Sequence, residues 1–87
     1  MAVSTIKNTV ANTKVASSSV TVSGNTINTI TLTVNDASFA LIKGFGVFSN
    51  ENIVIMQCLF SAPNTITVRV RNLISSSQTA TVQVYYC

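Results

Sequence analysis

Charged residues are scarce in this chain. Lys and Arg number five and Asp and Glu two, so charged residues make up 8% of 87 positions. Soluble monomers typically carry roughly 25–35% charged residues on their surfaces. Hydrophobic residues reach 47% and the mean hydropathy is +0.48, while a single domain of this length has limited core volume. We therefore expect apolar surface to be covered by further copies of the chain.

Histidine is absent, and the only acids are Asp36 and Glu51. General acid–base catalysis uses positioned His or carboxylate groups, and a Ser, Thr or Cys nucleophile needs a base beside it. The one conceivable alternative is a glycosidase-like pair of Asp36 with Glu51. No glycine-rich phosphate loop and no Cys-x-x-Cys metal motif occurs. The sequence therefore predicts a protein that is not an enzyme and has no cofactor or metal.

Basic residues are dispersed, although the formal net charge is +3. Arg69 and Arg71 are the only close pair, whereas nucleic-acid binders concentrate Lys and Arg on one face. No apolar run approaches the roughly 18 residues of a membrane helix. Residues 1–7 lack the charged start and apolar run of a secretory signal. We expect an unprocessed product that neither binds nucleic acid nor inserts into a membrane.

Cysteine occurs twice, at positions 58 and 87. Cys58 lies in an apolar run, where a buried free thiol is expected. Cys87 ends the chain, and we expect it to be the more reactive thiol. The alternative is a single bridge between the two.

Ser, Thr and Asn fill more than a third of the chain, and Val and Ile dominate the apolar remainder. Branched side chains favour strands. Apolar and polar residues alternate with period two in three segments, which places one set of residues in a core. The fold class expected is all-β: a small antiparallel sandwich, jelly-roll-like, with six to eight short strands. Its predicted core includes Ile30, Leu32, Val34, Val68, Val70, Val82 and Val84.

Residues 1–19 are expected to form an extended N-terminal arm or edge strand, and residues 20–87 the sandwich domain. Val3, Ile6, Val10 and Thr13 also fit a heptad-like stripe, which is the alternative for the arm. Ser17–Ser19 is expected to be a flexible join. Gly24 is expected to supply the positive φ of a hairpin turn, and Gly44 to mark a bulge in a strand from Phe39 to Phe48. Leu73 and Ile74 are expected to cover the end of the core.

The segment Ile53–Phe60 is apolar at nearly every position, which predicts a strand covered on both faces. One face can pack on the opposite sheet, and the other needs a second partner. Val54 and Met56 are therefore candidate interface residues.

Three further residues are candidate contacts with a receptor. Arg69 and Arg71 lie on the polar face of one strand, where a solubilising role is the alternative. Tyr85 and Tyr86 point to opposite faces of the last strand, so one of these rings is expected to be exposed. For Tyr85 the alternative is an interface or sheet-surface ring.

The segment Asn64–Asn72, a Ser/Thr-rich loop and Ala80–Tyr86 together resemble the end of small β-sandwich domains in bacteriophage tail fibres and head fibres. In those domains a penultimate strand ends in an Arg-Asn step, here Arg71-Asn72, and the last strand has a Val-x-Val-x-Tyr-like pattern. Ile42–Phe45 is similar to their mid-domain strand. The resemblance covers roughly residues 20–87, although long fibres precede such tips and at most 19 residues do here.

The resemblance implies a homotrimeric tip or knob. The expected function is that of a non-enzymatic virion structural protein of a bacteriophage, of fibre-tip or decoration type, assembled in the host cytoplasm. Other virion proteins and host-surface glycans are the further partners expected. The alternative is a monomeric carbohydrate-binding or adhesion module.

Overall fold

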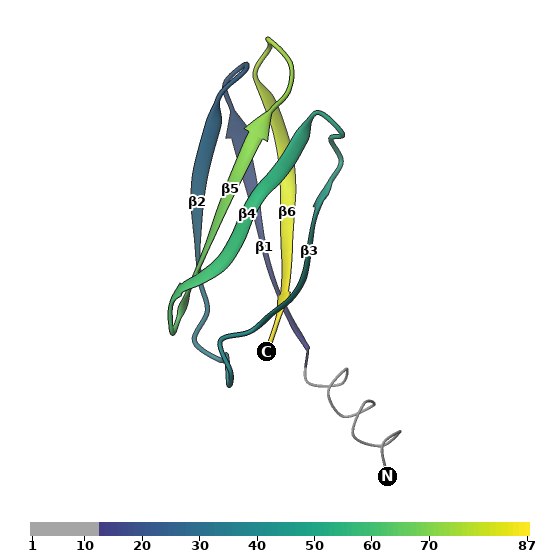
Figure 1. The fold of residues 1–87 in the computed structure, drawn as a ribbon. Helices are drawn as coiled ribbons and strands as arrows, with labels where there is room; N and C mark the ends of the chain where they lie inside the picture. The colour runs from purple at the N-terminus through teal and green to yellow at the C-terminus, as the bar shows by residue number, and fades with distance from the viewer. Residues whose placement is uncertain (1–12) are drawn as a thin grey trace.

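The computed structural model describes residues 13–87, which form six strands and no helix (Figure 1). All strand pairs are antiparallel, in one sheet of order β1-β6-β3 and another of order β2-β5-β4. The predicted all-β antiparallel sandwich is therefore confirmed. The strands are β1 (Lys14–Val22), β2 (Ile27–Thr33), β3 (Ile42–Phe48), β4 (Ile53–Ala62), β5 (Thr65–Asn72) and β6 (Gln78–Tyr86).

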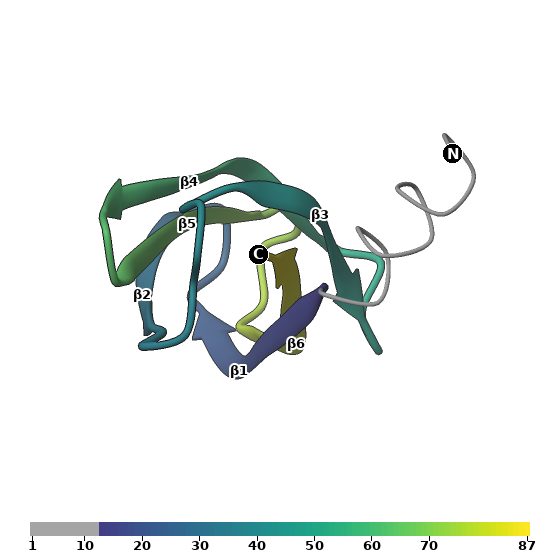
Figure 2. The same cartoon turned by 90° about the horizontal axis from the view of Figure 1, so that it is seen from below.

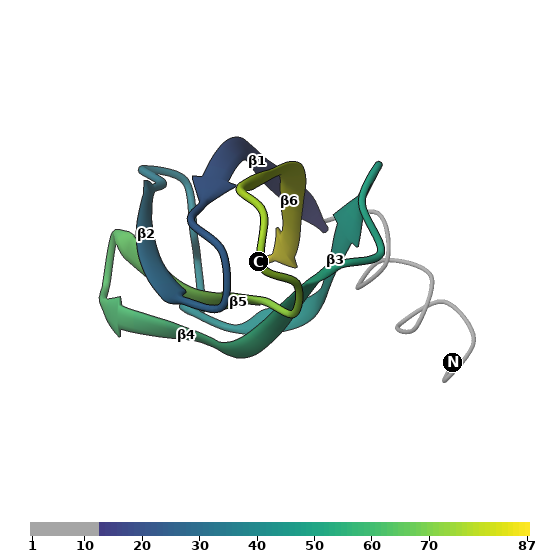
Figure 3. The same cartoon turned by 90° about the horizontal axis from the view of Figure 1, so that it is seen from above.

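The chain passes from one sheet to the other after β1, β2, β3 and β5. Only β4 and β5 form a hairpin, joined at Pro63 and Asn64. Views along the strands show β1 and β6 lying across from β4 and β5 (Figures 2 and 3). β5 and β6 are the central strands, so each sheet has two edges that no strand of the same sheet covers.

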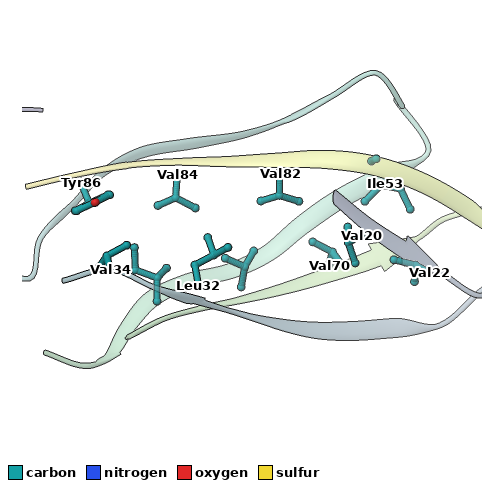
Figure 4. Packing of buried hydrophobic residues seen from close by; sticks show 12 residues of the cluster. Val20, Val22, Leu32, Val34, Ile53, Val70, Val82, Val84 and Tyr86 are labelled. Carbon is teal, nitrogen blue, oxygen red and sulfur yellow. The ribbon is translucent and has the colours of Figure 1, made fainter. Parts of the chain in front are cut away.

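The core lies between the inner faces of the two sheets. Val82, Val84 and Tyr86 of β6 face the side chains of β2 and β5 (Figure 4). Six of the seven predicted core residues are buried, and Ile30 is partly buried against the same cluster. Alternation with period two therefore identified the inner face of β2, β5 and β6 correctly.

The first strand differs from the prediction. Ser17–Ser19 is not a flexible join: these residues form the middle of β1 and pair with Gln83, Val82 and Thr81 of β6. The expected boundary between residues 19 and 20 falls inside this edge strand. Hydroxyl side chains are compatible with an edge strand that has one exposed face, because the partner strand supplies the backbone hydrogen bonds. Residues 1–12 of the expected arm, with Val3, Ile6 and Val10 of the heptad-like stripe, lie outside the described residues.

The predicted hairpin at Gly24 is wrong. β1 and β2 belong to different sheets, and the left-handed residue of the connection is Asn25 (φ 57°), not Gly24. Gly24 is needed for space, since a Cβ there would lie 1.9 Å from the carbonyl oxygen of Ser75. Glycine allows the β1–β2 turn to contact the β5–β6 loop.

The strand expected from Phe39 begins only at Ile42. Phe39 lies in the β2–β3 loop and is 79% exposed. The irregularity predicted near Gly44 is confirmed, because the register of β3 against β6 shifts between Ile42 and Gly44. Leu41 continues the pairing without belonging to β3: its N–H donates to the Cys87 carbonyl and its carbonyl accepts from the Cys87 N–H.

One end of the sandwich is held by the side chain of Asn72. Asn72 ends β5 and is fully buried. Its Nδ2 donates to the carbonyls of Val22 (3.0 Å) and Ser76 (2.8 Å), and its Oδ1 accepts from the Ile74 N–H (3.0 Å). The amide therefore joins β1, β5 and the β5–β6 loop. Leu73 was expected to cover the core end but is 52% exposed.

Candidate functional site

Arg69 and Arg71 lie on the outer face of the β2-β5-β4 sheet, as predicted. They alternate with the buried Val68 and Val70, and both are exposed. Arg69 is flanked by Thr29 of β2 and Gln57 of β4, and Arg71 by Ile27 and Val54. We call Arg69 and Arg71 the arginine row.

Apolar side chains are exposed along β4 and the neighbouring β3. Val54 and Leu59 pair outward with Arg71 and Thr67, and Met56 is the extra residue where the register shifts between Ile55 and Gln57. We call four of these exposed side chains the β3–β4 apolar surface. Their exposed fractions are 51% for Phe45, 49% for Met56, 37% for Val54 and 36% for Leu59. The two predicted interface candidates, Val54 and Met56, are therefore both exposed.

A cleft of about 250 Å³ connects the two strands of this surface. Its lining comes from the edges of both sheets: Phe45, Gly46 and Val47 of β3 with Ile53, Val54 and Ile55 of β4. Every one of these residues is apolar or glycine. Phe45 and Val54 thus share one hollow, although they belong to different sheets.

Tyr85 lies on the opposite outer face, on the β1-β6-β3 sheet, and is 39% exposed. Its hydroxyl donates to Gln83 Oε1 (3.1 Å), and its ring lies beside Gly44 of β3. Tyr86 is buried, so the prediction that the two rings point to opposite faces is confirmed. Tyr85 is therefore separated from the arginine row by the thickness of the sandwich.

A groove of about 610 Å³ lies between β1 and β2, and the sequence did not indicate it. Four of its lining residues carry hydroxyl groups: Ser17, Ser18, Thr31 and Thr33. Its one charged group is Asp36, whose carboxylate accepts a hydrogen bond of 2.5 Å from the Tyr86 hydroxyl. The lining is completed by Val15, Ala16, Leu32, Val34 and Asn35.

Tyr86 lines this groove and also belongs to the hydrophobic core. Its ring packs edge-on against Phe60, with centroids 6.2 Å apart. Burial of the phenol, the hydrogen bond to Asp36 and the charge of that carboxylate raise the pKa of Tyr86 to about 12. The hydroxyl is therefore a donor to Asp36 throughout the physiological pH range.

Both cysteines are free thiols, which confirms the absence of a bridge. Their relative burial is the reverse of the expectation, because Cys87 is buried and Cys58 only partly so. The backbone pairing of Cys87 with Leu41 holds the C-terminus against the fold. Burial raises the pKa of the Cys58 thiol.

Asp36 and Glu51 do not form a catalytic pair. Asp36 binds Tyr86 at one end of β6, and Asn50, next to Glu51, binds Gln78 and Thr79 at the other end. Eight strand steps of about 3.3 Å put these ends roughly 25 Å apart, whereas glycosidase carboxyls lie about 5–9.5 Å apart. Within residues 13–87 no three His, Cys, Asp or Glu side chains are placed to hold a metal ion. The same residues contain no helix suited to crossing a membrane.

No family model, curated protein or solved structure matches this chain. The described residues offer two outer faces of different character, one apolar surface that links both sheets, and one polar groove.

Proposed function

We propose that this chain is a non-enzymatic structural module that assembles with copies of itself through the β3–β4 apolar surface. The observation that carries the proposal is the exposure of four large apolar side chains, Phe45, Val54, Met56 and Leu59, of which Phe45 and Val54 line one apolar cleft. Burying a large apolar side chain contributes roughly 1.5–3 kcal/mol. The free energy gained by burying several such residues per subunit exceeds the repulsion and hydration that seven charged residues can contribute.

The edge of β4 supports the same proposal. Native edge strands are usually protected by Lys, Pro, short length or a covering segment. β4 is ten residues long, and its sequence IVIMQCLFSA contains neither a charged residue nor a proline. Its backbone is paired with β5 on one side only. A second copy seated on this edge would cover both the apolar side chains and the unpaired backbone groups.

We place this assembly in a bacteriophage virion, as a fibre tip or decoration protein. The support is the likeness of Asn64–Asn72 and Ala80–Tyr86 to the strands that end phage fibre domains. A homotrimer is the assembly that this likeness favours, and closed symmetry is the usual result when identical subunits associate. Peptides of this chain are then expected in purified virions of the phage that encodes it, and their absence would contradict this placement.

Substitution of Val54 by Asp tests the interface. A carboxylate at the edge of the apolar cleft would have to lose its hydration on association, so V54D should be monomeric by light scattering. Thr29→Asp is the matched control, because it adds the same charge to the same outer face on β2, away from β3 and β4. T29D should retain the wild-type mass. Equal masses for the wild type and V54D would place the interface elsewhere.

The groove between β1 and β2 supports a second candidate function, that of a monomeric carbohydrate-binding or adhesion module. Its volume lies within the usual range of ligand sites, and its carboxylate and hydroxyls could bind sugar hydroxyls. This function predicts a monomer that binds a neutral glycan and loses that binding in Asp36→Asn. A glycan array with wild type and D36N distinguishes it from the first proposal.

A further inference from the structure

We infer that the arginine row and the β2 side of its sheet form a docking surface for an acidic polysaccharide. The inference names the receptor chemistry for the proposed surface module, and it rests on that function because assembly supplies several copies of the row. The groups recognised are the anionic substituents of a sugar polymer, carboxylate or phosphate. Three features of the face lead to this assignment.

The first feature is the spacing of the two cations. Residues two apart on a strand point to the same face and lie roughly 6.6 Å apart along it. Arg69 and Arg71 can therefore each engage a separate anionic group on one extended polymer. A guanidinium presents a planar fork of N–H donors that fits carboxylate or phosphate bidentately.

The second feature is the lack of a competing acid. The four cross-strand neighbours of the row are all uncharged: Ile27, Thr29, Val54 and Gln57. Neither guanidinium has an ion-pair partner within residues 13–87. Asp36 is bound to Tyr86 in the groove on the other side of β2, and Glu51 lies in the β3–β4 loop. The positive charge of this face is therefore left for an external anion.

The third feature is the chemistry beside the row. Thr29 of β2 and Gln57 of β4 point outward with it and are exposed. Hydroxyl and amide groups suit the hydroxyls of a sugar chain. The outward residues of this sheet include no aromatic ring on which a base could stack, and two cations neutralise few phosphates. An acidic polysaccharide therefore fits this face better than a nucleic acid.

Assembly through the β3–β4 apolar surface leaves β2 open, because β2 lies at the opposite edge of the sheet. Arg69 has Thr29 and Gln57 as neighbours and lies clear of the interface residues, whereas Arg71 is opposite Val54 and borders the interface. Each copy then presents one arginine row. A polymer that contacts the arginine rows of several copies binds more tightly than a polymer that contacts one row. The first contact holds the polymer near the other rows, so the following contacts are intramolecular.

The test measures binding of the full chain to immobilised polygalacturonate, poly(glycerol phosphate), neutral dextran and single-stranded DNA. Wild type should bind one or both acidic polymers, with an affinity that falls as salt rises, and should not bind dextran. The stronger of the two acidic polymers identifies carboxylate or phosphate as the preferred group. Arg69→Gln combined with Arg71→Gln should raise Kd at least about tenfold, because charge-assisted hydrogen bonds are lost.

Lys14→Gln combined with Lys43→Gln is the matched control. It removes the same charge from the other sheet, and Kd should stay within about twofold of wild type because the arginine row is intact. Equal weakening in both double variants, tighter binding to DNA than to both polymers, or no binding to either acidic polymer would overturn the inference. Light scattering on the same samples separates the two proposals: an oligomer that does not bind overturns only the docking surface, and a monomer that binds overturns only the assembly.

Discussion

Asn72 shows at the scale of one residue how a polar side chain organises an apolar sandwich. It is the only polar residue that is buried among the described ones, and both ends of its amide are hydrogen-bonded. A buried amide is tolerated only when such partners are present. Its position after Arg71 shows why an Arg-Asn step suits the end of this strand: the first side chain points to solvent and the second into the fold.

Asn72→Ala should lower the free energy of unfolding by roughly 2–4 kcal/mol, because the buried Val22 carbonyl and the partly buried Ser76 carbonyl lose their donor. Chemical denaturation measures this change. Asn64→Ala, at the exposed β4–β5 turn, is the control and should change stability much less. A similar loss in both variants would contradict the role given to Asn72.

Tyr86 predicts a pH dependence of stability. Its pKa is raised to about 12 in the folded chain, against about 10 in an unfolded one. The folded state therefore holds the proton more tightly, and the resulting stability is complete below pH 10 and lost as the pH rises through about 12. Thermal unfolding should show a steeper loss of stability over this range in wild type than in Tyr86→Phe. Parallel plots of stability against pH for the two proteins would contradict the link between the Tyr86 proton and folding.

The cysteines give a third prediction at this scale. Cys87 is buried and its backbone is paired with Leu41, whereas Cys58 is partly exposed. A thiol reagent should modify Cys58 of the native protein before Cys87, slowly because burial raises the Cys58 pKa and lowers its thiolate fraction. Mass spectrometry of digested samples identifies the site. Earlier modification of Cys87 would show that the C-terminus opens.

At the scale of elements, alternation predicted β2, β5 and β6 because each has one buried and one exposed face. The continuity of β1 across residues 17–19 was predicted wrongly, because Ser side chains on both faces of its middle make its amphipathic pattern weak. Phe39 was assigned to a strand on hydrophobicity alone, but its backbone lies in a loop bound to Cys87. The conformation of these segments depends on pairing partners that are far apart in sequence, and no local sequence pattern identifies those partners.

The connection between β1 and β2 depends on a contact with a distant loop and not on a local turn preference. Gly24→Ala should destabilise the fold by roughly 1–3 kcal/mol, since its Cβ would overlap the Ser75 carbonyl oxygen at 1.9 Å. Gly46→Ala is the control, because its Cβ would find its nearest neighbour, Phe48, at 3.9 Å. Denaturation midpoints compare the two variants. Equal midpoints would show that the β1–β2 turn can move away from the β5–β6 loop.

At the scale of the whole molecule, three candidate regions indicated by the sequence have distinct positions on the sandwich. The arginine row and Tyr85 lie on opposite faces. Val54 lies on the same outer face as the arginine row, as the cross-strand neighbour of Arg71, so the apolar surface adjoins the row at the β4 edge. Their outward direction followed from alternation. The groove at Asp36 and the cleft shared by Phe45 and Val54 could not be predicted from alternation, because both depend on how the two sheets stack.

Sedimentation equilibrium of the wild-type chain tests self-association most directly. A molar mass three times that of the 9.2 kDa chain, maintained at micromolar concentration, is the result that the β3–β4 apolar surface and the fibre-tip likeness together predict. A mass of 9.2 kDa at the same concentration would contradict the assembly and leave the apolar surface without the role proposed for it.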